Sequence, residues 1–190
     1  MDTFQIYEDI KARTNGEIYI GVVGPVRTGK STFIKRFMDV LVLPYMEDEH
    51  AKARTRDELP QSGSGKTIMT TEPKFVPKEA AVIHLQEDLN LKLRLIDCVG
   101  YMVNGATGHL EENAQRMVKT PWFEEEIPFT HAAEVGTRKV IHEHATIGIV
   151  VTTDGTITEI DREAYLEAER KTIMELQLSL IHISEPTRPY

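Results

Sequence analysis

The sequence predicts an α/β protein with a mainly parallel sheet, and three observations support that prediction. An apolar, β-branched segment at 18–23 runs directly into a glycine-rich loop. Behind the loop, apolar residues recur every three or four positions over 29–43, which is the spacing of a helix. Two further strand-like segments, at 81–85 and 91–96, are separated by too few residues for a crossover, so they must be antiparallel. The sheet should therefore be mainly parallel, with one antiparallel edge strand.

Composition limits the classes of protein to which the chain can belong. Its 190 residues suit one domain, and an apolar fraction of 41% can supply a core. A net charge of -8 argues against nucleic acid as the main partner, because a phosphate backbone demands a basic surface. The single cysteine, Cys98, cannot form an internal disulfide, and no apolar run suits a membrane span or a signal peptide. We therefore expect a cytoplasmic protein.

The loop after the first strand matches the phosphate-binding pattern G-x-x-x-x-G-K-[ST] at every fixed position. Its glycines let successive N–H groups point inward, Lys30 brings a cation to the β- and γ-phosphate oxygens, and Ser31 offers a hydroxyl to Mg²⁺. A glycine-rich turn with an incidental lysine is the alternative, but strand, loop and helix stand in the order that a phosphate loop needs. The residues expected to bind nucleotide are Gly24, Pro25, Val26, Arg27, Thr28, Gly29, Lys30, Ser31 and Thr32.

The segments around this loop are expected to pack or connect. A short helix is predicted over 4–13, and the helix over 29–43 should end at Pro44. The charges at 47–61 are mixed in sign, which favours a solvated helix or a mobile loop over a dedicated binding patch. The stretch at 61–67 imitates a second phosphate loop but lacks the first glycine and a preceding strand, so we interpret it as a flexible loop.

Two threonines, Thr70 and Thr71, stand before the next strand-like segment. In phosphate-loop enzymes of the GTPase-like (TRAFAC) branch, a threonine in this loop meets Mg²⁺ and the γ-phosphate and orders the loop when triphosphate is bound. The alternative is that both are ordinary strand formers, and position alone does not decide between the two. Both are candidates for catalysis, and Thr71 is favoured as the metal ligand.

The second strand of the antiparallel pair ends in Asp97, and Gly100 follows three residues later. An acid at the carboxyl end of a buried strand is positioned to hold Mg²⁺, so Asp97 is a candidate catalytic and metal-binding residue. Gly100 completes a D-x-x-G motif whose glycine N–H can meet the γ-phosphate. Cys98 points away from Asp97 in a strand and is expected in the core. This motif and the antiparallel neighbour favour a P-loop NTPase of the GTPase-like (TRAFAC) branch.

The rest of the chain should continue the alternation of strands and helices. Aromatics in a long irregular region at 101–131 either fold back onto the core, which is slightly favoured, or form an exposed docking surface. A helix from Thr130, a buried parallel strand at 145–154 and a helix over 161–177 follow. Arg138 could act on phosphates, but an ordinary solvent-facing arginine is favoured. No glutamine follows the D-x-x-G motif where many GTPases position the attacking water.

Several segments together resemble the stage IV sporulation protein A family, cytoskeletal ATPases that build the basement layer of the bacterial endospore coat. They are GPVRTGKSTFIKRFM, IMTTEPKFVP, LRLIDCVGY and THAAEVGTRKVIHEHATIGIVVTTDGTITEI. The resemblance implies hydrolysis of ATP with Mg²⁺, and nucleotide binding by 24–31 with Lys30 as the indispensable cation. It implies that Thr70 and Thr71 are sensor threonines and that Asp97 is the Mg²⁺-associated acid.

The resemblance also implies partners and a place in the cell. Members polymerise irreversibly on the forespore surface, in the mother-cell cytoplasm. A small amphipathic membrane-binding sporulation protein recruits them, so membrane association is peripheral and runs through that partner. Other spore coat proteins are the remaining partners implied.

The chain departs from this family pattern at 178–190, and family members are considerably longer. We expect a nucleotide-binding domain over 1–177, incomplete at its C-terminus, and a non-native tail over 178–190, with a genuine short extension as the alternative. The segment that would read the base is not seen, so these residues do not separate ATP from GTP. A GTP-dependent regulatory switch and a nucleotide-binding scaffold without turnover are the alternative functions.

Overall fold

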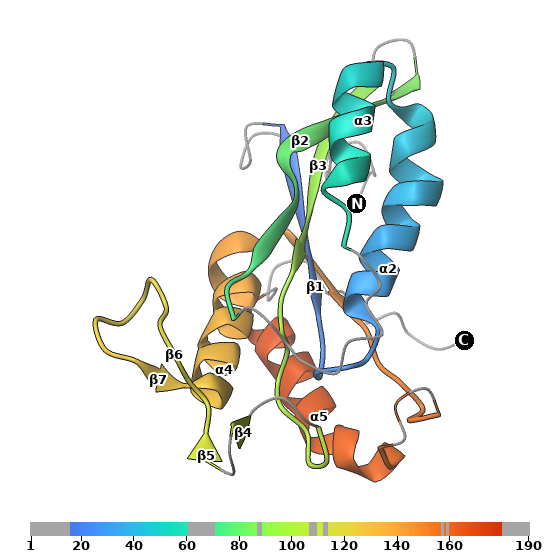
Figure 1. Ribbon diagram of the computed structural model, residues 1–190. Helices are drawn as coiled ribbons and strands as arrows, with labels where there is room; N and C mark the ends of the chain where they lie inside the picture. Colours follow the sequence, from blue (N-terminus) through green and yellow to red (C-terminus); the bar gives the residue numbers. More distant parts are fainter. Residues whose placement is uncertain are drawn as a thin grey trace.

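The computed structural model describes residues 16–60, 71–86, 89–106, 110–111, 114–156, 158 and 160–179, and its centre is a four-stranded sheet. The strand order is β2-β3-β1-β8 (Figure 1). β1 (Glu17–Val23) pairs in parallel with β3 (Leu89–Asp97) and with β8 (Ile147–Val150), and β2 (Lys74–Gln86) is antiparallel to β3. The predicted mainly parallel α/β sheet with an antiparallel strand beside it is confirmed.

Helices cover both faces of this sheet. Successive residues of a strand point to opposite faces, so apolar residues of the same strand can pack under both sets of helices. Val22 and Leu95 belong to the core under the first set of helices, whereas Val23 and Ile96 belong to the core under the second set. The first set consists of α2 (Lys30–Phe37), η1 (Met38–Val42), η2 (Leu43–Tyr45) and α3 (Glu49–Asp57). The second set consists of α4 (Phe129–Lys139), η3 (Val140–His144) and α5 (Arg162–Ser179).

The helix after the phosphate loop ends where it was predicted to end. α2 continues through a π-helical turn, η1, which stops at Val42, with Leu43 as its C-cap. Pro44 follows in the first turn of the separate 3-10 turn η2, where a helix has no internal partner for an N–H group and proline is tolerated. The predicted end of the helix at Pro44 is therefore confirmed.

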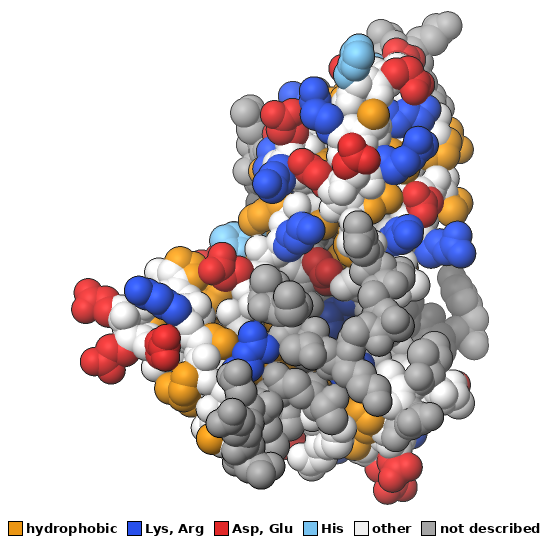
Figure 2. Space-filling view, viewed as in Figure 1, with side chains coloured by type: hydrophobic (Ala, Val, Ile, Leu, Met, Phe, Trp, Pro, Cys, Tyr) orange, Lys and Arg blue, Asp and Glu red, His pale blue; other side chains and the backbone are white. Residues whose placement is uncertain are grey.

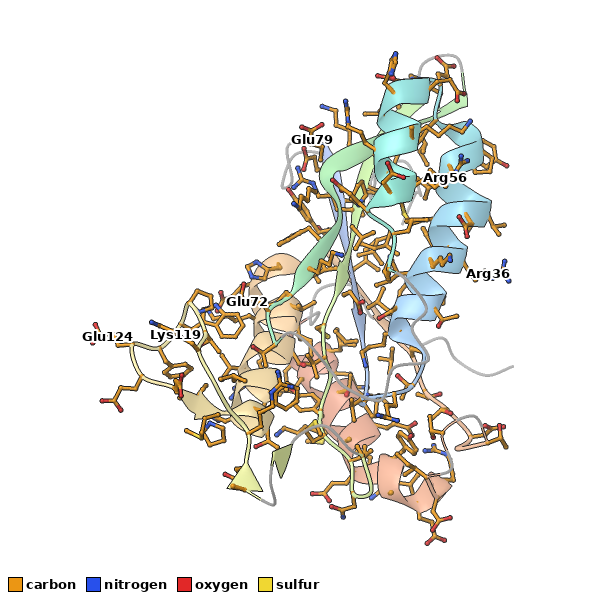
Figure 3. The ribbon with its side chains drawn as sticks, viewed as in Figure 1. Arg36, Arg56, Glu72, Glu79, Lys119 and Glu124 are labelled. Atoms are coloured by element: carbon orange, nitrogen blue, oxygen red, sulfur yellow. The ribbon has the colours of Figure 1, made fainter. Side chains whose placement is uncertain are left out.

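The charged segment after η2 forms the solvated helix α3. The Asp48 carboxylate accepts hydrogen bonds from the N–H groups of His50 and Ala51 at 2.8 and 3.0 Å, which starts the helix. Acidic and basic side chains are interspersed over this part of the surface (Figure 2). Arg56 of α3 and Glu79 of β2 lie on the outside of the molecule (Figure 3). The mixed charges therefore belong to a solvated helix, one of the two forms favoured from the sequence.

The region between β3 and α4 contains two small ladders, and its aromatic residues divide between core and surface. Phe129, at the start of α4, is buried, whereas Phe123 is 39% exposed. The core alternative therefore holds for Phe129, whereas Phe123 lies at the surface and a docking role for it stays a prediction. One ladder joins β4 (Leu110–Glu111) to β5 (Ala114–Gln115), and the other joins β6 (Met117–Val118) to β7 (Ile127–Pro128) and projects from the body as an arm (Figure 1).

The last strand and helix differ in detail from the sequence prediction. β8 is parallel as expected but only partly buried, because it ends the described sheet; Ile147 is exposed. α5 runs to Ser179, two residues beyond its predicted end. The helix predicted over 4–13 and the loop predicted over 61–67 lie outside the described residues. Within the described ranges, no helix has both the length and the apolarity to cross a membrane.

Candidate functional site

The candidate site lies at the carboxyl ends of the central parallel strands. The loop at 24–29 joins the end of β1 to the start of α2. The β1–β3 register pairs Val22 with Asp97, so the end of β3 reaches the same level. Carboxyl ends of neighbouring parallel strands are the usual place for ligands in open α/β sheets. The sheet therefore brings the phosphate-loop sequence and Asp97 together.

The loop has the backbone shape that its glycines were expected to allow. Gly24 and Gly29 have φ angles of 145° and 88°, in the region that favours glycine. A Cβ atom on Gly24 would lie only 2.3 Å from the Val151 carbonyl oxygen, so no larger residue fits there. The Gly29 carbonyl accepts from the Phe33 N–H at 2.8 Å, which starts α2 directly behind the loop. This arrangement leaves the N-terminus of α2 directed at the loop, as anion binding requires.

Lys30 is the buried cation of the loop, with its side chain folded over the backbone. Its Nζ donates to the Pro25 carbonyl at 2.6 Å and more weakly to the Gly24 carbonyl at 3.4 Å. Burial lowers the pKa of Lys30, and the charge of the nearby Asp97 carboxylate acts in the opposite direction. A cation held in this way is available to phosphate oxygens with little further ordering. The position predicted for Lys30 is consistent with phosphate binding.

Ser31 and Asp97 form a pair suited to a hard divalent cation. The Ser31 hydroxyl donates to Asp97 Oδ2 at 2.6 Å, across 66 residues of sequence. The other carboxylate oxygen, Oδ1, is buried without a hydrogen-bond partner among the described residues. Burial raises the pKa of Asp97, while the Ser31 hydrogen bond and the Lys30 charge oppose that rise. A hydroxyl and a carboxylate are ligands that Mg²⁺ prefers, so these residues fit the predicted metal.

Cys98, next to Asp97, belongs to the core. Its side chain is 7% exposed, and its Sγ lies 3.6 Å from the Val22 carbonyl oxygen. Burial raises the pKa of Cys98 to about 11, so the thiol stays protonated at neutral pH. The expectation of a small core residue is confirmed.

Gly100 brings the D-x-x-G segment against the phosphate loop. Its φ angle is 95°, and a Cβ atom there would lie 2.1 Å from the Gly24 carbonyl oxygen and 2.7 Å from Lys30 Nζ. The backbone carbonyl of the next residue, Tyr101, accepts from the Val26 N–H at 2.9 Å. The Gly100 N–H donates to the Thr137 hydroxyl at 3.2 Å. The two motifs are thus in direct contact, through groups that glycine alone leaves accessible.

Thr71 lies against α4, beside Thr137, whose hydroxyl accepts from the Gly100 N–H. It is buried, and a Cβ atom on Gly136 would lie 2.7 Å from the Thr71 carbonyl oxygen. Glu72, which follows it, lies just before the start of β2, on the side of α4 (Figure 3). Thr71 as a metal ligand stays a prediction, and Thr70 lies outside the described residues.

Sequence reasoning did not single out Thr137 among the residues of the helix predicted from Thr130. Thr137 is fully buried and contacts the D-x-x-G segment through Gly100. A signal was present, since Thr137 stands four residues after Ala133, on the apolar side of the helix, where a polar residue needs a partner. The neighbouring Arg138 instead points outward and pairs with Glu175 at 3.5 Å, as expected of a solvent-facing arginine.

Comparison with known proteins gives the family. A family model described as stage IV sporulation protein A, ATPase domain, matches residues 1–183. The chain belongs to this family. The resemblance seen in the sequence segments is thereby confirmed.

Three curated relatives carry the name stage IV sporulation protein A. The chain is 57% identical over 193 residues to the one from Bacillus subtilis (strain 168) and 55% identical over 195 residues to the one from Bacillus anthracis; each alignment covers 100% of this chain, and 39% and 40% of the relative. It is 61% identical over 172 residues to the one from Clostridioides difficile (strain 630), covering 90% of this chain and 35% of the relative. The chain thus spans about two fifths of the length of these relatives. No solved structure matches.

Proposed function

We propose that the protein binds ATP with Mg²⁺ and hydrolyses it, on a P-loop fold of the GTPase-like (TRAFAC) branch. The observation that carries the proposal is the 2.6 Å hydrogen bond between Ser31 and Asp97, next to a buried Lys30. A hydroxyl, a carboxylate and a cation converge there at the N-terminus of a helix, which is the set of groups that phosphoryl transfer uses. The antiparallel β2 beside β3 supports the GTPase-like branch.

Catalysis would rest on positioning and charge. The N–H groups of the loop and the Lys30 ammonium bind the phosphates and favour the negative charge that spreads over them as the terminal bond breaks. Ser31 and Asp97 would hold Mg²⁺, which supplies further positive charge when bound. Thr71, with Thr70 as the second candidate, would close over the γ-phosphate and release when it leaves.

The consequence of hydrolysis would be a change in an assembly surface. By analogy with its family, the protein would polymerise into the basement layer of the endospore coat, at the forespore surface in the mother-cell cytoplasm. A small amphipathic membrane-binding protein would recruit it, and other spore coat proteins would join it. The net charge of -8 supports protein partners over nucleic acid.

The test measures release of radiolabelled phosphate from ATP and from GTP, side by side, with the full-length protein. We expect Mg²⁺-dependent release from ATP, and its loss in Lys30→Ala, because that variant removes the buried cation of the loop. Lys35→Ala, which removes a partly exposed lysine one turn further along α2, is the matched control and should retain activity.

The alternative functions give distinct outcomes in the same assay. Faster release from GTP would favour a GTP-dependent switch, which the antiparallel edge strand also fits. Binding of nucleotide without release would favour a scaffold. Normal ATP turnover by Lys30→Ala would contradict the proposed mechanism altogether.

A further inference from the structure

The N–H group of Gly100 is held by a specific acceptor on α4. It donates to Thr137 Oγ1 at 3.2 Å, and that hydroxyl donates its own hydrogen to the Ala133 carbonyl at 2.8 Å. A threonine hydroxyl has one hydrogen and two lone pairs, so the bond to Ala133 leaves a lone pair for Gly100. Thr137 is fully buried, which leaves little room for water to replace either contact. The hydroxyl is therefore an oriented acceptor for the Gly100 N–H, and both groups also lie beside the Cys98 thiol.

Gly100 also lies against the groups that bind phosphate. A Cβ atom on it would come within 2.7 Å of Lys30 Nζ and 2.1 Å of the Gly24 carbonyl oxygen. A terminal phosphate held by Lys30 would therefore lie next to Gly100, close to its N–H group. One N–H makes one strong hydrogen bond, so Thr137 and the terminal phosphate would compete for it.

We propose that Thr137 is a positioning residue that competes with the γ-phosphate for the Gly100 N–H and so sets the preference of the site for triphosphate over diphosphate. The inference rests on the proposed ATP binding. A diphosphate has no γ-phosphate to offer, so it leaves the contact between Gly100 and Thr137 intact. A triphosphate can accept from the Gly100 N–H only if the hydrogen bond to Thr137 breaks. The free energy of that lost hydrogen bond is subtracted from the binding free energy of the triphosphate.

α4 extends the effect to the threonine loop. Gly136, adjacent to Thr137, packs against the Thr71 carbonyl, where an added Cβ atom would come within 2.7 Å. The same turn of α4 therefore contacts both segments that the sequence predicts to sense the γ-phosphate. Release of Gly100 from Thr137 would loosen the D-x-x-G segment from the helix that also supports Thr71.

The test compares Thr137→Val, which keeps the shape and removes the acceptor, with Thr137→Ser, which keeps the hydroxyl. Calorimetric titrations with a non-hydrolysable ATP analogue and with ADP give the two affinities in the presence of Mg²⁺. For Thr137→Val we expect the affinity for the ATP analogue to rise about fivefold, the factor that matches one ordinary hydrogen bond, with the ADP affinity unchanged. Thr137→Ser should have the parental ratio of the two affinities.

Other outcomes overturn the inference. A role in packing alone would change both affinities of Thr137→Val in parallel or leave both unchanged, and a direct role in binding would weaken the ATP analogue. If Thr137→Val does not fold, as judged by thermal unfolding, Thr137→Ala is measured in its place, and it should also raise the affinity ratio. A parental protein that binds neither nucleotide would refute the proposed function itself, whereas parental binding with an unchanged ratio refutes only the role of Thr137.

Discussion

Gly100→Ala is the substitution whose effect can be worked out most fully from the geometry. The residue has a φ angle of 95°, and a non-glycine residue in that conformation costs about 1–2 kcal/mol. The new Cβ atom would also overlap the Gly24 carbonyl oxygen, at 2.1 Å, and overpacking of this kind costs about 1–3 kcal/mol. The free energy of unfolding should therefore fall by about 2–5 kcal/mol in total. Nucleotide binding should be lost as well, because relief of the overlap displaces the phosphate loop.

Gly105→Ala is a matched control for this prediction. Gly105 has a similar φ angle, 86°, but an added Cβ atom would meet only the Ile160 side chain, at 3.8 Å and 3.9 Å, which is ordinary contact. The free energy of unfolding of Gly105→Ala should fall by only about 1–2 kcal/mol, the cost of the backbone conformation, and its nucleotide affinity should stay unchanged. Urea unfolding and nucleotide titration of both variants check this. Equal destabilisation of the two variants, or parental nucleotide affinity in Gly100→Ala, would refute the steric reasoning.

Two further predictions concern the carboxylate and the threonines. Burial raises the pKa of Asp97 above 3.8, so its contribution to stability is present below that pH and is lost as the pH rises through the folded-state pKa. Asp97→Asn keeps an acceptor for Ser31, so this variant should be at least as stable as the parent at neutral pH. Its free energy of unfolding in urea should lose the pH dependence that Asp97 causes, and it should bind nucleotide poorly with Mg²⁺. An unchanged pH dependence of unfolding would contradict the reasoning. Thr70→Ala combined with Thr71→Ala should bind ATP but release phosphate roughly a hundredfold more slowly, because closure over the γ-phosphate is lost, and parental turnover would remove these threonines from catalysis.

Local patterns were read correctly where the residue type itself dictates the geometry. Gly24 and Gly29 adopt the positive φ angles that their places in the phosphate loop require. The short interval between β2 and β3 allows only an antiparallel pair. The helix after the phosphate loop ends before Pro44 because a continuing helix would need the N–H that proline lacks, whereas the first turn of the 3-10 turn that follows does not need it.

The sequence by itself therefore determined the phosphate loop, the acid at the end of β3, and the mainly parallel sheet with its antiparallel neighbour. These follow from chemistry within a few residues and from the periods of helix and strand. Only the tertiary structure decided that Ser31 meets Asp97, that Thr71 packs on Gly136 and that Thr137 holds Gly100. Each of those contacts joins residues that are between 37 and 66 positions apart in the sequence. The contacts therefore depend on strand register and helix packing, which no local pattern encodes.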